Sequence, residues 1–389
     1  MTGSDLPMRV LIVTGASDRF HSDLPQTMAL VGLKHAGVEI EVMCPDTAPT
    51  RQLMVDAGIR VSHLAIGNRF DFAARRALRE RLATGGYDIV HAFNAHALQN
   101  VLPAARGRGT RVLVYRGTVG NVSVFDPMAW ATYLHPRLDR IACVADAARE
   151  FFDTQLHLPW WRFPVGKAVT IAKGHDLDWY QEPPVARADL GVPDDAFLVA
   201  CLVNERPRKG LSYLVDALPA MRCEGRPVHL LLIGRVHVKK TLARIAANSA
   251  RERIHLVGFR SDAAQVQAAS DVCVLPTLKR EGLPRAVIEG MAYGVTPVVT
   301  NAGGSKELIV DGESGLVIEP GSAVAISDAV NYLAADPGRN RAMGQAARQR
   351  IPSHFSVEAT VEKTLALYRE LIADGRMGGG PAAGAGPVG

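Results

Sequence analysis

The stretch "FLVACLV" occupies residues 197–203 and consists of seven consecutive apolar side chains. A strand with one face in water would alternate apolar and polar residues, so this run predicts a strand that is buried on both faces. Such strands belong to parallel sheets that are covered by helices on either side. The strand runs directly into "NERPRKG" (204–210), a loop rich in cations. The stretch therefore predicts a parallel strand that ends at a positively charged loop.

Similar short apolar runs recur along the whole chain, with helical patterns between them. Two such series in one chain predict an α/β protein with two doubly wound, Rossmann-like domains that face each other across a cleft. The runs in the first half are "RVLIVTG" (9–15), "VEIEVMC" (38–44), "RVSHLAI" (60–66), "DIVHAF" (88–93), "RVLVYRG" (111–117), "RIACVA" (140–145) and "AVTIAKG" (168–174). Those in the second half are "FLVACLV" (197–203), "HLLLIG" (229–234), "IHLVG" (254–258), "VCVLP" (272–276), "TPVVT" (296–300) and "GLVI" (315–318).

The length of 389 residues also favours two domains, because a single hydrophobic core rarely organises so long a chain. We place the boundary in the polar, proline-rich segment 176–195, with an N-terminal domain over 1–178 and a C-terminal domain over 179–354. Apolar residues at helical spacing predict a helix over 355–375, which could pack across the junction or back on the N-terminal domain. The Gly/Pro-rich tail 376–389 is predicted to be disordered.

Composition and charge indicate a cytoplasmic protein. Apolar residues make up 48% of the chain and charged residues 21%, as in soluble globular proteins. There is no secretory pattern and no apolar run long enough for a bilayer, and the five dispersed cysteines favour a reducing compartment.

The net charge is +5, and its whole excess lies in residues 1–175, which include the run Arg69–Arg81. This run predicts docking to an anionic membrane surface, or else it is a solvated helix face.

Two loops of the second half carry residues suited to a ligand. Arg206 and Lys209 follow the strand at 197–203 and precede a helix, and cations beside a helix N-terminus form a site for phosphates. The alternative is that these charges only keep the loop soluble. In the loop after 272–276, Gly282 allows a close approach of the backbone to a ligand, and Pro284 suits the start of a helix. The N–H groups of Gly282 and Leu283 then point into the cleft.

Glu281 and Glu289 flank this second helix start. Carboxylates repel phosphates, so we expect both residues to accept hydrogen bonds from sugar or ribose hydroxyls while the cations neutralise a diphosphate. A nucleotide sugar offers both kinds of group. The alternative is a pair of solvent-facing glutamates, since this spacing occurs on many helices by chance.

The segment "EGLPRAVIEGMAYGVTPVVTNAGGSKELIVDGESGLVIEPG" (281–321) closely resembles the E-x(7)-E region of glycosyltransferase family 4, retaining enzymes with the GT-B fold. The resemblance extends over "NERPRKG", "HLLLIG", "IHLVGFRSD" and "ASDVCVLPT" in the family's order, and so over most of 195–350. It implies a C-terminal domain that binds the nucleotide-sugar donor and an N-terminal domain that binds the acceptor.

The resemblance also implies individual roles. Glu281 would contact the donor sugar and Glu289 the ribose, while Arg206 and Lys209 would form the pyrophosphate clamp. Of these residues, Glu281, Arg206 and Lys209 are the catalytic candidates. The backbone at Gly258 and Phe259 would hold the base. Family members need no bound metal, and the clamp would replace a metal's charge beside the leaving diphosphate.

The first half resembles the acceptor domain of the same family more loosely. Phe93 and Arg116 stand where histidines are common, Ala145 replaces a serine, and the first loop keeps one glycine, Gly15, which we assign to the donor side. Arg116 cannot be a general base, because an arginine side chain keeps its proton in proteins, but it could bind phosphate or hydroxyls. His96 and His21 lie at loop positions and are candidates for proton handling, with a purely structural role as the alternative.

"LPWWRFP" (158–164) places Trp160 and Trp161 side by side in a strand-like segment, where both cannot face the core. One ring could stack on a sugar acceptor or sit in a membrane interface, with packing at the domain junction as the alternative.

The sequence therefore predicts a retaining, metal-independent glycosyltransferase that uses a UDP- or GDP-linked sugar and needs no further cofactor. The acceptor would be a glycan, a glycolipid or a small hydroxyl compound in cell-surface synthesis, and no nucleic acid is expected as a partner. Two alternatives stay open at this point: a donor-binding module that has lost catalysis, and another sugar-nucleotide enzyme such as an epimerase.

Overall fold

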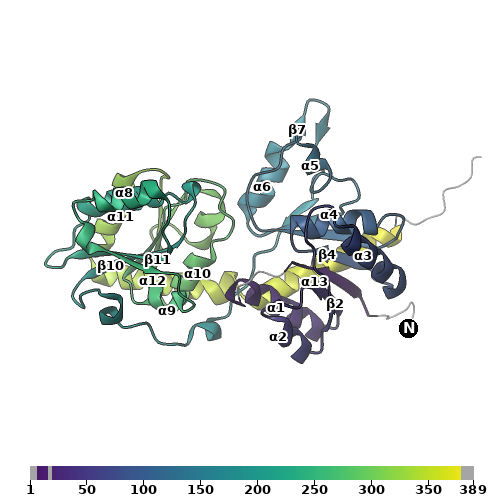
Figure 1. Cartoon of the computed structure of the whole chain (residues 1–389), viewed down its shortest axis with the longest axis horizontal. Helices are drawn as coiled ribbons and strands as arrows, with labels where there is room; N and C mark the ends of the chain where they lie inside the picture. Colours follow the sequence, from purple (N-terminus) through teal and green to yellow (C-terminus); the bar gives the residue numbers. More distant parts are fainter. Residues whose placement is uncertain (1–6, 16–19, 378–389) are drawn as a thin grey trace, which may run out of the picture.

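The computed structural model describes residues 7–15 and 20–377 of the chain, which form two lobes (Figure 1). The first lobe contains a parallel sheet of seven strands in the order β3-β2-β1-β4-β5-β6-β9. Its strands are β1 (Arg9–Val13), β2 (Glu39–Cys44), β3 (Arg60–His63), β4 (Ile89–Ala92), β5 (Arg111–Arg116), β6 (Arg140–Cys143) and β9 (Ala168–Thr170).

The second lobe contains a parallel sheet of six strands in the order β12-β11-β10-β13-β14-β15. Its strands are β10 (Phe197–Asn204), β11 (Val228–Arg235), β12 (Ile254–Gly258), β13 (Val272–Leu275), β14 (Thr296–Thr300) and β15 (Leu316–Ile318). The predicted fold class, two doubly wound α/β domains, is confirmed by these two sheets.

Helices connect the strands and cover both sheets. The first lobe has α1 (Phe20–His35), α2 (Arg51–Asp56), α3 (Phe72–Gly85), α4 (Ala95–Ala104), α5 (Pro127–Trp130) and α6 (Asp146–Gln155). The second has α7 (Leu211–Ala217), α8 (Lys239–Ala246), α9 (Ala263–Ala268), α10 (Arg285–Ala292), α11 (Ala323–Ala334) and α12 (Pro337–His354), and α13 (Val357–Met377) ends the described chain.

Strand β10 shows why its sequence lacks alternation. Phe197 and Val199 pack into one cluster with residues of α7 and α11. Leu198 and Ala200, which point the other way, pack into a second cluster with residues of α9. Both faces of the strand are thus buried, and a polar residue on either face would be placed in a core.

The strand order creates a switch point in each sheet. In the first lobe successive strands are added on one side of β1 and then on the other, beginning with β4, and in the second lobe the same change of side occurs between β10 and β13, while all these strands stay parallel. Doubly wound sheets bind ligands at the carboxyl ends of the strands beside such a point. The loops that follow β1, β4, β10 and β13 are therefore the places to look for a site.

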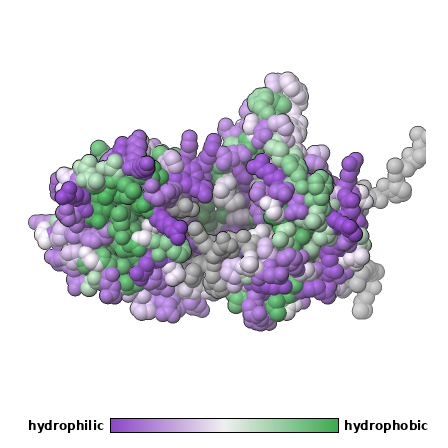
Figure 2. Space-filling view, in the orientation of Figure 1, coloured by the Kyte–Doolittle hydropathy of each residue, from purple (hydrophilic) through white to green (hydrophobic). Residues whose placement is uncertain are grey.

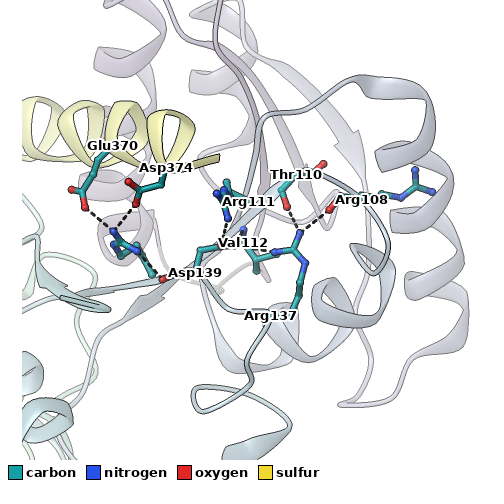
Figure 3. Close-up of polar contacts among 9 residues, drawn as sticks. Arg108, Thr110, Arg111, Val112, Arg137, Asp139, Glu370 and Asp374 are labelled. Carbon is teal, nitrogen blue, oxygen red and sulfur yellow. Dashed lines mark hydrogen bonds and ion pairs between the residues drawn. The ribbon is translucent and has the colours of Figure 1, made fainter. Parts of the chain in front are cut away.

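Helix α13 returns from the second lobe and packs on the first, where it runs beside α1 (Figure 1). Leu367, Tyr368 and Leu371 are buried in the cluster that also holds residues of β1 and β2. Figure 3 shows the polar contacts at the far end of the helix, where the guanidinium of Arg140 donates to Glu370 at 2.7 Å and to Asp374 at 3.0 Å. Close by, Asp139 accepts hydrogen bonds from Arg111, Arg137 and the N–H of Val112.

The two connections between the lobes lie side by side. The N–H of His175 donates to the carbonyl of Phe355 at 2.7 Å, and a Cβ on Gly174 would lie 2.1 Å from the carbonyl oxygen of Ser356. The two chain crossings therefore form one narrow junction.

Candidate functional site

The C-terminal loops of β10 and β13 meet through an ion pair. Nζ of Lys209 lies 2.6 Å from Oε2 of Glu281, and the hydroxyl of Thr277 donates to the same oxygen at 3.0 Å. Glu281 is only 9% exposed, so it is not a solvent-facing glutamate. Two residues from different loops, both predicted for the donor site, are thus brought together at the switch point of the second sheet.

The two loops are also locked together through their backbones. The N–H of Leu278 donates to the carbonyl of Arg208 at 2.8 Å. Gly210 has φ +67° and lies so close to β13 that a Cβ would stand 2.0 Å from the carbonyl oxygen of Pro276. The position of Lys209 relative to Glu281 is therefore set by the backbone as well as by the ion pair.

Arg280 and Asn121, from opposite lobes, both have positive φ, of 63° and 57°. They are the two non-glycine residues with positive φ in the described part of the chain, and the guanidinium of Arg280 donates to the amide oxygen of Asn121. Left-handed backbone at such residues persists only where the surroundings hold it, and it gathers at functional sites. The contact fixes the residue directly before Glu281 against the first lobe.

Gly282 approaches the first lobe even more closely. A Cβ at this position would lie 2.3 Å from the carbonyl oxygen of Gly117, which is closer than any real contact. We expected Gly282 to allow the approach of a ligand, whereas the close approach in the structure is to the N-terminal lobe. Leu283 and Pro284 follow, and Pro284 is the N-cap of α10, so the helix itself begins at Arg285.

A third contact between the lobes is a helix cap. The carboxylate of Glu307 accepts hydrogen bonds from the N–H groups of Asp146 and Ala147, both at 2.7 Å. Ala145, the N-cap of α6, has no side-chain oxygen to serve these groups. Glu307 therefore supplies from the other lobe the cap that a serine at position 145 could have supplied locally. Its burial raises the pKa of the Glu307 carboxyl.

Glu289 is 5% exposed and lies within α10. Its Oε1 is 3.1 Å from Nε of Arg285, one turn earlier. Burial raises the pKa of the Glu289 carboxyl, and Arg285 offsets part of that effect. No contact links Glu289 to Lys209 or Glu281 among the described side chains, so its role at the ribose stays a prediction.

The raised pKa of Glu289 predicts a pH dependence of stability. The folded state holds this proton more tightly than the unfolded state, so the stability that it contributes is complete below the ordinary glutamate pKa of about 4.3 and is lost as pH rises through the folded value. Glu289→Gln removes this loss. The free energy of unfolding of both chains is measured with urea at several pH values. We expect the difference, variant minus unmodified chain, to become more favourable to the variant as pH rises.

Exposed Glu313 provides the matched control, Glu313→Gln, for this measurement. A difference between Glu289→Gln and the unmodified chain that stays constant with pH would contradict a raised pKa.

The remaining donor-side candidates lie at the ends of β10 and β12. Arg206 is exposed and makes no side-chain hydrogen bond or ion pair within residues 7–15 and 20–377, so it is available to an anion. Gly258 ends β12 with φ +67°, and Phe259 is 59% exposed, with the guanidinium of Arg235 6.0 Å from its ring.

Sequence reasoning missed Thr277, Glu205 and Glu307. Glu205 is 7% exposed and accepts hydrogen bonds from the N–H groups of His237 and Val238, which orders the start of α8. Burial acts to raise its pKa, but hydrogen bonds from Thr241, Val238 and His237 outweigh burial and lower it. A carboxylate in the first position after a buried strand was a signal for Glu205. Nothing in the sequence marks Glu307 as a partner of α6.

In the first lobe, Gly15 and His96 meet at the other switch point. Together with Ile66, Asn94 and Ala95 they line one hollow. Asn94 is the N-cap of α4 and accepts a hydrogen bond from the N–H of Ala97 at 2.8 Å. His21 lies in the first turn of α1, and its side chain falls outside the described residues.

Arg116 is 8% exposed and holds its own loop. Its guanidinium donates to the carbonyls of Thr118 and Gly120 and lies 4.5 Å from the centre of the Tyr133 ring. In this conformation the guanidinium of Arg116 is occupied by contacts within its own lobe. Binding of phosphate or hydroxyls by Arg116, as predicted from the sequence, would require these contacts to break.

The arginine run also differs from a continuous charged stripe. Arg81 pairs with buried Glu41, Arg76 lies 2.8 Å from Glu80, and Arg75 donates to Asn100. Part of the positive charge is therefore neutralised within the lobe.

The fold, two doubly wound lobes that meet through the loops after β5 and β13, defines the GT-B architecture. The family model described as "Glycosyltransferase Family 4" matches residues 29–179, and the one described as "Glycosyl transferases group 1" matches residues 184–350. The two matches follow one another and together take in most of the chain, which belongs to glycosyltransferase family 4.

Similar proteins include a GDP-mannose-dependent alpha-(1-6)-phosphatidylinositol monomannoside mannosyltransferase of Mycolicibacterium smegmatis, 34% identical over 46% of this chain and 50% of the relative. A lipopolysaccharide core biosynthesis mannosyltransferase, LpcC, of Rhizobium leguminosarum is 27% identical over 64% and 69%. HepE of Anabaena, solved in complex with UDP-glucose, superposes with a TM-score of 0.73 at 18% identity, covering 92% of this chain and all of that structure. The chain spans about half the length of the first of these relatives.

Among the helices within residues 20–377, none combines the length and the apolar character that crossing a bilayer demands.

Proposed function

We propose that the chain transfers a sugar from a nucleotide-diphosphate donor to a hydroxyl acceptor, with retention of configuration and without a bound metal ion. The observation that carries this proposal is the pair of Lys209 and Glu281, held at 2.6 Å by two loops at a switch point. One member supplies positive charge and the other a hydrogen-bond acceptor, which suits a ligand that has both phosphates and hydroxyls.

The donor phosphates would lie beside Lys209 and Arg206, with no cofactor beyond the donor itself. Arg206 has no competing partner in the described chain, so it can bind an anion without breaking an existing contact. Positive charge placed where the leaving diphosphate develops negative charge lowers the barrier to transfer. Glu281 would orient the sugar and Glu289 the ribose.

Transfer with retention of the anomeric configuration agrees with the residues on the acceptor side of the cleft. The guanidinium of Arg116 is a hydrogen-bond donor without an acceptor atom and is bound to its own loop, so it cannot remove the acceptor's proton. We therefore assign this proton to a leaving phosphate oxygen on the same face of the sugar. In this mechanism His96 is not required as a base, although it lines the hollow beside Gly15.

A GDP- or UDP-linked sugar is the proposed donor, and a membrane glycolipid or a surface glycan the proposed acceptor. The mannosyltransferase of Mycolicibacterium smegmatis is named for GDP-mannose and a phosphatidylinositol mannoside, and the Rhizobium relative for the lipopolysaccharide core. These names support a place in cell-envelope synthesis. The location that we propose is the cytoplasmic face of a membrane.

The test is a panel of UDP-, GDP- and ADP-linked sugars, each with glycolipid and glycan acceptors, in which release of nucleoside diphosphate is measured. We expect one donor to be turned over, and the anomeric configuration of the product, read by NMR, to match that of the donor. Activity should persist after treatment with EDTA. Inversion at the anomeric carbon, or a loss of activity that added Mg²⁺ restores, would contradict the corresponding part of the proposal.

Two other outcomes would replace this function. Tight binding of one donor without turnover would identify a binding module, for which the occupied side chain of Arg116 offers a structural reason. Conversion of the sugar while it stays attached to the nucleotide would identify an epimerase.

A further inference from the structure

A small hairpin projects from the N-terminal lobe, outside both large sheets (Figure 1). It is formed by β7 (His157–Leu158) and β8 (Trp161–Arg162), and we call residues 157–165 the prong. Trp160 is 82% exposed and Val165 is 99% exposed. Figure 2 shows hydrophobic surface near the tip of this projection.

The prong stands on a packed base. Trp161 contacts Trp130 with ring centres 5.0 Å apart, and both rings pack against the core of the lobe. The indole N–H of Trp130 donates to the carbonyl of Val124 at 2.8 Å, and the next residue, Phe125, is 83% exposed. Of the two adjacent tryptophans, one therefore anchors the hairpin and the other is presented to the surroundings.

Along the chain, the segment that contains the prong carries charge of one sign. No aspartate or glutamate occurs between Asp153 and Asp176, whereas Arg162 and Lys167 fall within this interval. Arg162 is exposed. An exposed indole favours the interface between water and lipid tails, and nearby cations favour anionic headgroups.

We propose that the prong, together with Phe125, inserts into the interface of a bilayer that contains anionic lipids and so docks the N-terminal lobe on a membrane. A second copy of the chain is the less suitable occupant. A stable protein interface buries about 800 Å² on each partner, and a narrow hairpin tip offers few side chains for that.

The prong is joined to the cleft by one short segment. Residues 117–130 lead from Gly117 and Asn121, which contact the second lobe, to Trp130 at the base of the prong. Docking would thus place a membrane surface on the lobe whose loop at 117–121 contacts the loop of Glu281. A link between docking and a lipid acceptor rests on the proposed function, whereas docking itself does not.

The test uses the full chain and vesicles of phosphatidylcholine with and without phosphatidylglycerol. The double variant Trp160→Ser, Val165→Ser is expected to bind the anionic vesicles about tenfold more weakly, because two apolar side chains no longer leave water. Tryptophan emission should shift to the blue when vesicles are added to the unmodified chain and shift less for the variant. Arg162→Glu should weaken binding only to the anionic vesicles.

Two variants serve as controls. Val324→Ser changes an exposed valine on α11 in the other lobe, and it should bind vesicles like the unmodified chain. Arg79→Glu changes an exposed arginine of the run Arg69–Arg81 and tests that surface separately. Circular dichroism checks that every variant is folded.

Vesicle binding by the double variant equal to that of the unmodified chain would overturn the proposal. So would a loss of binding in Arg79→Glu alone, which would locate the contact on α3. A dimer that the double variant converts to monomers, with vesicle binding unchanged, would identify a protein partner instead. The measurement needs no donor, so failure of sugar transfer with intact vesicle binding would overturn the proposed function and leave the docking surface in place.

Discussion

Replacing Lys209 with methionine is expected to lower kcat/KM for sugar transfer by about 10²–10³, which is about 2.7–4 kcal/mol of transition-state stabilisation. Nζ of Lys209 is already held 2.6 Å from Glu281, so its charge is positioned before any donor arrives. Methionine keeps much of the length of the side chain and removes the charge together with the N–H donors of the ammonium group. Initial rates of nucleoside diphosphate release, with the donor found by the panel, measure the effect.

Lys279 offers a matched control, because it lies exposed in the loop that also contains Glu281. Lys279→Met should retain the rate of the unmodified enzyme within about a factor of two, as surface substitutions usually do. Lys209→Met also leaves buried Glu281 without its cation, so thermal unfolding has to be compared in the same samples. A folded Lys209→Met enzyme with full kcat/KM would remove Lys209 from the proposed mechanism.

The two-sheet fold could be predicted because parallel strands carry their burial in the sequence. Phe197, Leu198 and Val199 point to alternate faces, and each of them is almost fully buried. An apolar run of this kind has no stable place except between two layers of helices. "LPWWRFP" was harder to interpret, because a strand-like pattern does not reveal whether the strand joins a large sheet. The segment forms a separate hairpin, with Trp161 inside and Trp160 outside.

The proximity of Lys209 and Glu281 could be predicted, whereas the contacts between the lobes could not, for a physical reason. Lys209 and Glu281 each lie in the loop that follows a strand, and the loops at neighbouring strand ends are close in space whatever the rest of the chain does. Contacts between the lobes follow no such rule. Glu307 caps α6 across the junction, and a local pattern cannot reveal an acceptor for N–H groups 160 residues away.

The role of Gly282 shows the same limit. A glycine in a loop at a strand end indicates that something approaches closely, but not what approaches. In the structure it is the carbonyl oxygen of Gly117, at 2.3 Å from the position of a Cβ. The sequence thus identified the need for a small residue and left open which neighbour required it.

Gly282→Ala should therefore act on the arrangement of the lobes, not on the binding of the donor. The new methyl group cannot fit against Gly117, so we expect the lobes to separate and kcat to fall by about 10², the effect of a small misplacement of the reacting groups. Donor affinity should change little, because Lys209, Glu281 and Glu289 all belong to the second lobe. Small-angle scattering should show a larger radius of gyration.

Gly109→Ala is the matched control, since a Cβ there meets nothing within 4 Å. It should leave both the rate and the scattering unchanged. Each lobe of Gly282→Ala retains its own core, so the unfolding midpoint should stay close to that of the unmodified chain. If donor affinity fell together with kcat, the glycine would serve the donor loop itself. If rate and scattering both stayed unchanged, the contact with Gly117 would not hold the lobes in the arrangement that transfer requires.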